Sequence, residues 1–496
     1  MSSENQWPLY ISIVLIVYAV VILFFVVRGA LKTKKISDYA IGNMGFPSWI
    51  VGLSLAASMT SAATFVINPG FIALYGVSGI ISMAVVLPLA AFVSLIFFTK
   101  GFAKYGKMVK ANTMSQWIGN RFDNNSYKFF FAIVAMLLIT FIVLINVGLT
   151  QVISKSLEVE PFYVLLGITV FVFGYMMFGG ANSMVYTNTV QALIMVIVAL
   201  MMIFSGVNLF ENGIAGFVEK LNVIDPHLTK TFNETSPLYR DFFEVVICQA
   251  IVGVAIICQP HIMTKSLMLK NPEKVNSYLF FAIASMLIFF FIVIAGLYAR
   301  IMFPDLVADG TKMKMDEIIP VYVVKRFSAA AGILVVVGLI SAGLSTLEGL
   351  IQSLSITVTS DILEPMFGEK ITENGLVINK IVIVLLAAVS FYFSWNQIKN
   401  PNLSVGIFGQ MGVYGYFAAA FVPVLFGTFV KNVKSSTVFV ASIVAILVHF
   451  GIFYLKLTPY MKGAVGNPGV SAAIAIVSSV AVALILHIFN KKSATA

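Results

Sequence analysis

The stretch TSAATFVINPGF, from Thr60 to Phe71, lies inside an apolar segment long enough to cross a lipid bilayer. It places small and hydroxylated residues mid-segment and an Asn-Pro-Gly sequence just beyond them. A second apolar segment carries VGVAIICQPHI, from Val252 to Ile262, with Gln-Pro-His inside it. A single proline or glycine is tolerated in a membrane helix. Two such groups, each in the first segment of a possible five-segment unit, instead predict a matching pair of broken helices.

The composition around these stretches is that of an integral membrane protein. The 496 residues are 59% hydrophobic and only 10% charged, whereas soluble domains have about 25% charged residues. Apolar windows of about 20 residues, the length that spans a bilayer, recur about thirteen times along the chain. The sequence therefore predicts an all-α protein with about thirteen transmembrane helices. It shows no catalytic constellation, so we do not expect an enzyme.

Basic residues predict the orientation of these helices. They follow the first, third, seventh, eleventh and last segments, which places them on one side of the membrane; examples are Lys32, Lys34, Lys35, Lys265, Lys274, Lys431 and Lys434. Cytoplasmic loops carry an excess of Lys and Arg. We therefore expect a multi-pass protein of the cell membrane with its N-terminus outside and its C-terminus in the cytoplasm. The net charge of +10 then reflects topology and does not indicate nucleic-acid binding.

The segments group into five parts. We predict an N-terminal extra helix with a cytoplasmic loop, a first repeat, an external loop, a second repeat and two C-terminal helices, over residues 1–45, 46–211, 212–240, 241–430 and 431–496. Each repeat holds five spans, and an odd number gives the two repeats opposite orientations. Paired broken helices in inverted repeats are typical of the midplane binding site of a transporter.

A third stretch, LISAGLSTLEGLIQSLS from Leu339 to Ser355, carries hydroxyls and one carboxylate at bilayer depth. Ala342, Ser345 and Thr346 are spaced i, i+3, i+4 and share one helix face. Glu348 lies about 60° around the helix from Ser345 and one turn further on. A carboxylate in this position costs about 2.5–3.5 kcal/mol, which calls for a partner or a function.

Four stretches together resemble the sodium/solute symporter family, which includes pantothenate and proline permeases and sodium-coupled monocarboxylate carriers. They are GLSLAASMTSAATFVINPGFIALYG (52–76), FGGANSMVYTNTVQALIM (178–195), QPHI (259–262) and SAGLSTLEGLIQSLSITVTSDIL (341–363). The resemblance covers nearly the whole chain. It implies the LeuT-like fold, a five-plus-five inverted repeat with one extra N-terminal helix and two extra C-terminal helices.

The resemblance also implies a sodium site between the first and eighth core helices. By position, backbone carbonyls of Ala57 and Thr60 and the oxygens of Ala342, Ser345 and Thr346 would be its ligands. The residue types fit a sodium site, since a hard cation prefers oxygen ligands and an unwound helix frees backbone carbonyls. For an isolated pair of hydroxyls, hydrogen bonding to their own helix would be the alternative.

Some relatives have a second sodium site, and here the chain departs from the family pattern twice. Asn188 stands where those relatives have an aspartate, and Glu348 stands where they have a hydroxyl. One interpretation is a second ion site of Glu348, Asn188 and Ser345, with the carboxylate relocated. The others are a Glu348 paired with Gln352, and a Glu348 that carries a proton.

The expected function is sodium-coupled symport of a small organic solute, with a small carboxylate as the favoured substrate. Proton coupling, an amino acid or sugar as substrate, and a channel or sensor on the same scaffold are the alternatives. The candidate substrate contacts are Ser61, Thr64, Asn146, Gln151, Val252, Ile256 and Gln259. Val252 and Ile256 stand where proline carriers have aromatic residues, which argues against a proline-type pocket. We expect Na+, the solute and the lipid bilayer as partners, without nucleic acid or an obligatory protein partner.

Overall fold

Two helical spans of the computed structural model are broken where the sequence predicts breaks. The first consists of α3 (Ser48–Met59) and the continuous η2 (Ala63–Ile67) and α4 (Asn68–Tyr75), which meet at 55°. The second consists of η7 (Phe243–Cys248) with α12 (Gln249–Ile256), followed by α13 (Pro260–Met263) with η8 (Thr264–Met268), at 57°. Both breaks fall at the polar residues of the stretches that predicted them.

The structure describes residues 7–495 except 44, 110, 270–271, 369–370, 372, 401–404 and 464. The other long helices are α1 (Trp7–Ala30), α6 (Leu87–Val109), α9 (Ile139–Leu157), α10 (Pro161–Phe204), α14 (Val275–Phe291), α17 (Ala329–Ile356), α20 (Gly375–Lys399), α21 (Val405–Phe429), α22 (Ser435–Tyr454) and α23 (Pro468–Thr495). In the described part, ten helices are long and apolar enough to span a membrane, and the two broken pairs raise the count to twelve.

Helix α10 accounts for the thirteenth span. Its 44 residues would extend about 66 Å, twice the hydrocarbon thickness of about 30 Å. Gly180 interrupts it with φ 58° and ψ −159°, a conformation that does not continue a helix. A Cβ at this position would lie 2.6 Å from the Tyr39 ring, so both backbone and packing require glycine. Counting α10 as two spans brings the described part of the chain to thirteen, the number predicted.

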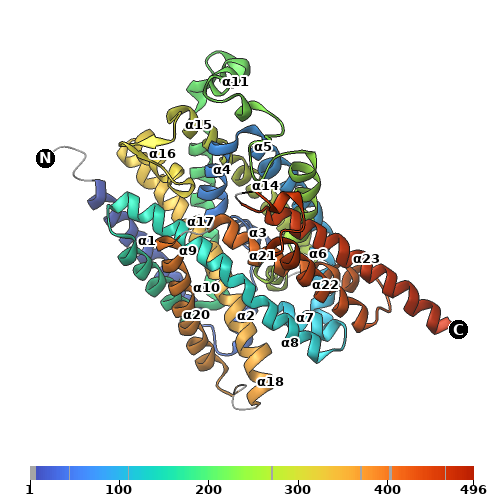
Figure 1. The fold of residues 1–496 in the computed structure, drawn as a ribbon. Helices are drawn as coiled ribbons and strands as arrows, with labels where there is room; N and C mark the ends of the chain where they lie inside the picture. The colour runs from blue at the N-terminus through green and yellow to red at the C-terminus, as the bar shows by residue number, and fades with distance from the viewer. Residues whose placement is uncertain are drawn as a thin grey trace.

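Short elements connect or extend the spans. They are α2 (Ile36–Ile41), α5 (Val77–Ile80), η3 (Ile81–Val86), α7 (Met114–Arg121), α8 (Asn125–Val134), η4 (Ala135–Leu138), η5 (Val207–Phe210), α11 (Gly213–Ile224), η6 (Pro226–Thr229), η9 (Pro272–Lys274), η10 (Ile292–Ile294), α15 (Ala295–Met302), η11 (Met315–Glu317), α16 (Ile318–Arg326), η12 (Thr357–Leu363), α18 (Glu364–Phe367) and η13 (Pro459–Met461). One antiparallel hairpin joins β1 (Val307–Ala308) to β2 (Thr311–Lys312). Helices α11 and α18 lie at opposite ends of the molecule (Figure 1).

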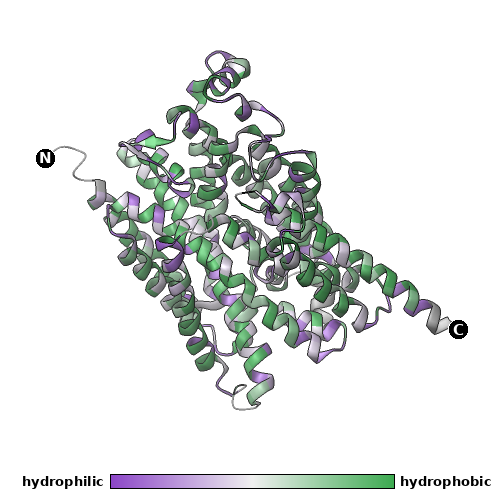
Figure 2. Cartoon of the chain, viewed as in Figure 1, coloured by the Kyte–Doolittle hydropathy of each residue, from purple (hydrophilic) through white to green (hydrophobic). Residues whose placement is uncertain are grey.

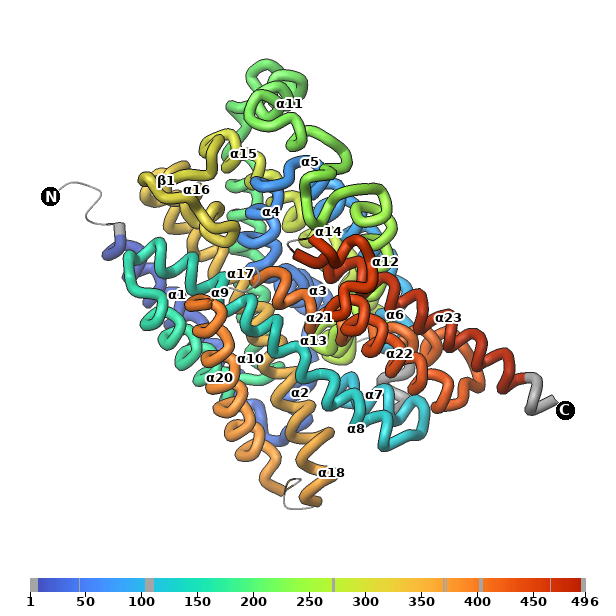
Figure 3. The backbone as a smooth tube through the Cα atoms, in the orientation of Figure 1, coloured from blue at the N-terminus to red at the C-terminus, as the bar shows by residue number. Residues whose placement is uncertain are grey.

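The broken helices lie at the centre of the bundle. Helix α3 packs against α10, α14 and α17, and α13 packs against α3 and α17; both lie near the middle of the tube in Figure 3. Helices α1 and α20 flank α10, and α22 and α23 pack on each other and on α21. The long helices are hydrophobic along most of their length, while hydrophilic residues gather near α11 and in the connections between spans (Figure 2). The polar residues at the central breaks are therefore enclosed by apolar helices.

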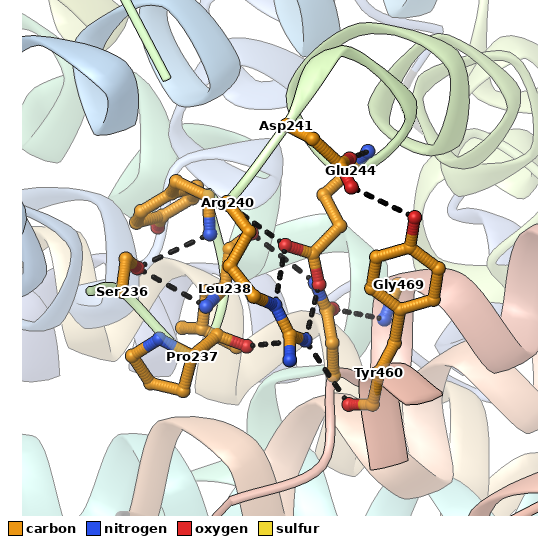
Figure 4. A network of polar contacts seen from close by, with 10 residues as sticks. Ser236, Pro237, Leu238, Arg240, Asp241, Glu244, Tyr460 and Gly469 are labelled. Carbon is orange, nitrogen blue, oxygen red and sulfur yellow. Dashed lines mark hydrogen bonds and ion pairs between the residues drawn. The ribbon is translucent and has the colours of Figure 1, made fainter. Parts of the chain in front are cut away.

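The ion pair of half-buried Arg240 with buried Glu244, at the start of η7, is hydrogen-bonded to the connection between the last two helices (Figure 4). The Glu244 carboxylate, which is fully buried, accepts from Arg240 Nε at 2.9 Å and from Asn467 Nδ2 at 3.0 Å. Arg240 also donates to the Tyr460 carbonyl at 3.1 Å, and its hydrogen bond to Glu244 raises the pKa of the guanidinium. Tyr460 donates to Asp241 at 2.8 Å. We call this group, Arg240, Asp241, Glu244, Tyr460 and Asn467, the terminal clamp.

Candidate functional site

The end of α3 and the middle of α17 meet through hydroxyl and carbonyl oxygens. Ser345 Oγ donates to the Ala57 carbonyl at 2.8 Å and lies 3.1 Å from the Ala342 carbonyl. Thr346 Oγ1 donates to the Ser58 carbonyl at 3.1 Å and lies 3.4 Å from the Ala342 carbonyl. All five residues are buried. Five oxygens, two of them hydroxyls, thus lie together at the break in α3.

This oxygen cluster suits a hard monovalent cation. Helix α3 ends at Met59 and Thr60 is extended, with φ −116° and ψ 94°, so the last carbonyls of α3 lack the partners that a further helical turn would supply. The negative end of the α3 dipole adds to the attraction. The cluster contains no carboxylate, which matches an ion of single charge.

The structure brings together four of the five residues predicted for the primary sodium site: Ala57, Ala342, Ser345 and Thr346. Thr60 lies on the break itself, where its amide nitrogen is 3.3 Å from the Ala57 carbonyl. Its Oγ1 is buried and has no hydrogen-bond partner in the described part of the chain. The Ser58 carbonyl was not predicted; it adjoins the predicted Ala57 on the last turn of α3.

Glu348 is fully buried and surrounded by donors. Tyr175 OH donates to its Oε1 and Thr187 Oγ1 to its Oε2, each at 2.6 Å. Gln191 Nε2 donates to Oε1 at 3.1 Å. Three helical segments thus supply the site: the two halves of α10 hold the donors, and α17 holds the carboxylate. Tyr175, Thr187 and Gln191 were not predicted as site residues, although Thr187 and Gln191 share a face of α10 at the i, i+4 spacing.

Two sequence interpretations near Glu348 are wrong. Gln352 is not its partner, because the Gln352 amide nitrogen donates to the Tyr39 and Ala40 carbonyls at 2.8 and 2.7 Å. Lys265 is not a loop residue that reports orientation. The bend after α12 turns η8 back into the bundle, and the Lys265 side chain is fully buried there, where it donates to the Ser54 carbonyl at 3.0 Å.

A cavity lies between the two broken helices. Its polar lining residues are Ser58, Ser61, Thr64, Asn68, Gln259, His261, Gln410 and Tyr414. Its apolar lining includes Met59, Phe141, Leu144, Ile256 and Phe290. None of the described lining residues is Asp, Glu, Lys or Arg. Ser58 belongs to both the cavity and the oxygen cluster, so a bound solute and a bound cation would be neighbours.

Four of the seven predicted substrate contacts line this cavity: Ser61, Thr64, Ile256 and Gln259. Gln259 Oε1 and His261 Nδ1 are buried there without a partner in the described chain, so they are available to a solute. His261 was not among the predicted substrate contacts, although it belongs to the QPHI stretch. Gln410 and Tyr414 on α21 gave no sequence signal, because α21 is continuous and apolar around them.

The other three predicted contacts lie outside the cavity. Asn146 lies two residues beyond Leu144, about 200° around α9, and its Nδ2 faces Ser394 Oγ on α20 at 3.4 Å. Gln151 lies about two turns beyond Leu144 along the same helix. Val252 is fully buried one turn before Ile256 and is not among the lining residues.

The model of the sodium:solute symporter family matches residues 39–445. The sodium/pantothenate symporter of Escherichia coli is 22% identical over 470 residues, which cover 90% of this chain and 92% of the relative. The sodium/sialic acid symporter NanT of Aliivibrio fischeri is 22% identical over 455 residues, covering 88% and 86%.

Solved structures show the same fold. The substrate-bound, outward-open state of a Na+-coupled sialic acid symporter superposes with a TM-score of 0.78, covers 97% of each chain and is 19% identical. A nucleobase-cation-symport-1 family transporter with bromovinylhydantoin bound superposes with a TM-score of 0.54, covers 92% and 93% of the chains and is 13% identical. The predicted LeuT-like fold is confirmed.

Proposed function

Because the chain belongs to the sodium:solute symporter family, we propose that it carries a small carboxylate into the cell together with sodium. It is a sodium-coupled solute symporter of the membrane, a transporter and not an enzyme. The observation that carries the proposal is the contact of the Ser345 and Thr346 hydroxyls with the carbonyls at the end of α3. The primary sodium would bind there and hold α3 to α17.

Two observations support a carboxylate as the solute. Pantothenate and sialic acid, the solutes named for the two relatives, both carry a carboxylate. The second half of the first broken span begins at Ala63 and runs to Tyr75. Its first residues Ala63 and Thr64, and Ser61 in the break before them, line the cavity. The N-terminal end of a helix attracts negative charge. This end would therefore bind the carboxylate without a basic side chain.

Sodium and solute would bind from outside while the cavity is open to that side, and both would leave inward after the broken helices rock against the rest of the bundle. Each positive charge that moves inward across 100 mV releases about 2.3 kcal/mol. Ser58 would couple sodium binding to solute binding, since it lines the cavity and its carbonyl belongs to the oxygen cluster. The N-terminus would lie outside and the C-terminus in the cytoplasm.

Uptake into proteoliposomes tests this function. The purified protein should accumulate radiolabelled pantothenate, sialic acid or another small carboxylate when an inward sodium gradient is imposed. An equal potassium gradient should give no accumulation. Sodium-dependent uptake that is competed by neutral sugars and not by carboxylates would rule out the proposed substrate class while leaving sodium coupling intact.

Gln259→Leu should raise the KM for the solute about tenfold and leave the sodium concentration for half-maximal uptake unchanged. The lost hydrogen bond is worth about 1–1.5 kcal/mol, and 1.4 kcal/mol is a factor of ten. Gln249→Leu is the matched control: both glutamines belong to the same broken span, are 3% exposed and have an unpartnered Oε1 in the described chain. Gln249 does not line the cavity, so equal effects of the two variants would contradict the assignment.

A further inference from the structure

Lys265 is a buried cation whose three hydrogen-bond donors are all used. Its Nζ donates to the Ser54 carbonyl at 3.0 Å and to Ser54 Oγ at 2.5 Å. With the Asn188 amide oriented so that its oxygen and nitrogen both have partners, the third acceptor is its side-chain oxygen at 2.9 Å. An ammonium has three N–H donors and no acceptor. The environment of Lys265 therefore matches the charged form of the side chain.

Asn188 bridges Lys265 to Glu348. In the orientation that satisfies both ends of its amide, the oxygen accepts from Lys265 Nζ and Ser58 Oγ, each at 2.9 Å. The nitrogen then donates to Glu348 Oε2 at 3.1 Å and to Gln191 Oε1 at 3.0 Å. The amide dipole thus points its negative end at the ammonium and its positive end at the carboxylate.

Glu348 has the complementary arrangement. Its two oxygens accept from Tyr175, Thr187, Gln191 and Asn188, and a carboxylate offers about four lone-pair directions. No acceptor position is left for a metal ion. Within the described chain neither Glu348 nor Lys265 has a direct ion pair shorter than 4.0 Å. The two charges face each other across Asn188 and balance.

This group adjoins the oxygen cluster and joins four helical segments. Ser54 and Ser58 are on α3, Lys265 is on η8 of the second broken span, Asn188 is on α10 and Glu348 is on α17. Ser58 connects the two groups directly, because its hydroxyl contacts Asn188 and its carbonyl contacts Thr346. The Lys265 ammonium is thus separated from Ser58 of the oxygen cluster by a single residue, Asn188.

We propose that Lys265 is a tethered cation that takes the place of a second sodium ion, with Glu348 as its counter-charge across Asn188. The carrier then couples to one sodium, bound at the primary site. This inference rests on the proposed function and replaces the freely exchanging ion predicted for Glu348, Asn188 and Ser345 with a side chain. Lys265 is a positioning residue: it links both broken spans to α10 and α17 at every step of the cycle, because it cannot dissociate.

Removing the ammonium should create the missing ion site. Lys265→Ala removes the ammonium from the Ser54 carbonyl, Ser54 Oγ and the Asn188 oxygen, beside the charge of Glu348. Oxygen ligands and a nearby carboxylate are what a sodium ion requires. Equilibrium binding of 22Na+ to the purified protein, without any solute, should give one ion per wild-type chain and two per Lys265→Ala chain.

Two further variants distinguish an effect of the Lys265 charge from an effect of its side-chain packing. Lys265→Arg retains the cation and should bind one ion. Lys265→Ala combined with Glu348→Gln lacks both charges and should also bind one. If Lys265 has only a structural role, Lys265→Ala should have a lower melting temperature and still bind one sodium ion. That result would overturn the proposal.

The wild type alone keeps the proposal testable if Lys265→Ala does not fold, because two ions bound to the wild type would overturn it. A wild type that binds no sodium would refute the primary site and the proposed function. A gain of one ion on removal of Lys265 would still support the tethered cation in that case. The two proposals can therefore fail separately.

Discussion

Replacing both Ser345 and Thr346 with alanine should raise the sodium concentration for half-maximal uptake about a hundredfold. Each hydroxyl offers one oxygen at the end of α3, within 2.8 Å of the Ala57 carbonyl for Ser345 and 3.1 Å of the Ser58 carbonyl for Thr346. A polar contact to a charged group contributes about 1.5 kcal/mol or more, and 1.4 kcal/mol is tenfold. Sodium titration of solute uptake in proteoliposomes measures this effect.

Ser355→Ala is the matched control for this double variant. Ser355 is on the same helix and fully buried, and its hydroxyl donates to the Gln352 carbonyl of its own helix at 3.1 Å. We expect its sodium dependence to equal that of the wild type. A well-folded Ser345→Ala/Thr346→Ala protein with wild-type sodium dependence would remove the primary site from the mechanism.

Glu244→Ala should destabilise the folded protein by about 1.5–3 kcal/mol, the contribution of hydrogen bonds to a charged group, because the Arg240 side chain is 22% exposed and can be hydrated in the variant. The variant removes the carboxylate that Arg240 and Asn467 share in the terminal clamp and leaves them only backbone carbonyl acceptors. Its melting temperature in detergent should fall clearly. The clamp lies outside the sodium site, so the affinity for 22Na+ should be retained at temperatures where the variant is folded.

Lys155→Ala provides the comparison for Glu244→Ala. Lys155 Nζ lies 3.4 Å from Glu317 Oε1, and its side chain is 43% exposed. Exposed pairs of this kind contribute at most about 1 kcal/mol, so its melting temperature should barely change. Similar small shifts in both variants would show that the terminal clamp does not stabilise the fold.

The spans and breaks of this fold could be predicted from the sequence because they depend on local chemistry. Apolar length fixes where helices cross, and polar groups such as Thr60-Ser61 and Gln259-Pro260 mark where helical hydrogen bonding fails. Asn68-Pro69-Gly70 instead continues the helix that begins at Ala63. Gly180 was harder to place. It interrupts α10 within a run of residues that all have helical dihedral angles, and its conformation becomes necessary only once Tyr39 packs against it.

The site was only partly predictable for a related reason. The i, i+3, i+4 spacing of Ala342, Ser345 and Thr346 is visible in one helix. The burial of Lys265 depends on a 57° bend that turns a segment predicted as a loop into the bundle. Gln410 and Tyr414 enter the cavity through the packing of α21 against other helices, and no pattern along α21 reveals which face that is.

The turn at Gly180 limits how the proposed topology can be mapped. The fifth and sixth spans run into each other through one residue, without a polar loop in which a reporter enzyme or an epitope tag could be inserted. An insertion there would disrupt both spans and report on a misfolded chain. The long connection that contains α11 (Gly213–Ile224) offers a better place, since Ile214 and Val223 are 75% and 81% exposed. A single cysteine introduced there should react with a membrane-impermeant maleimide in intact cells if that side is external.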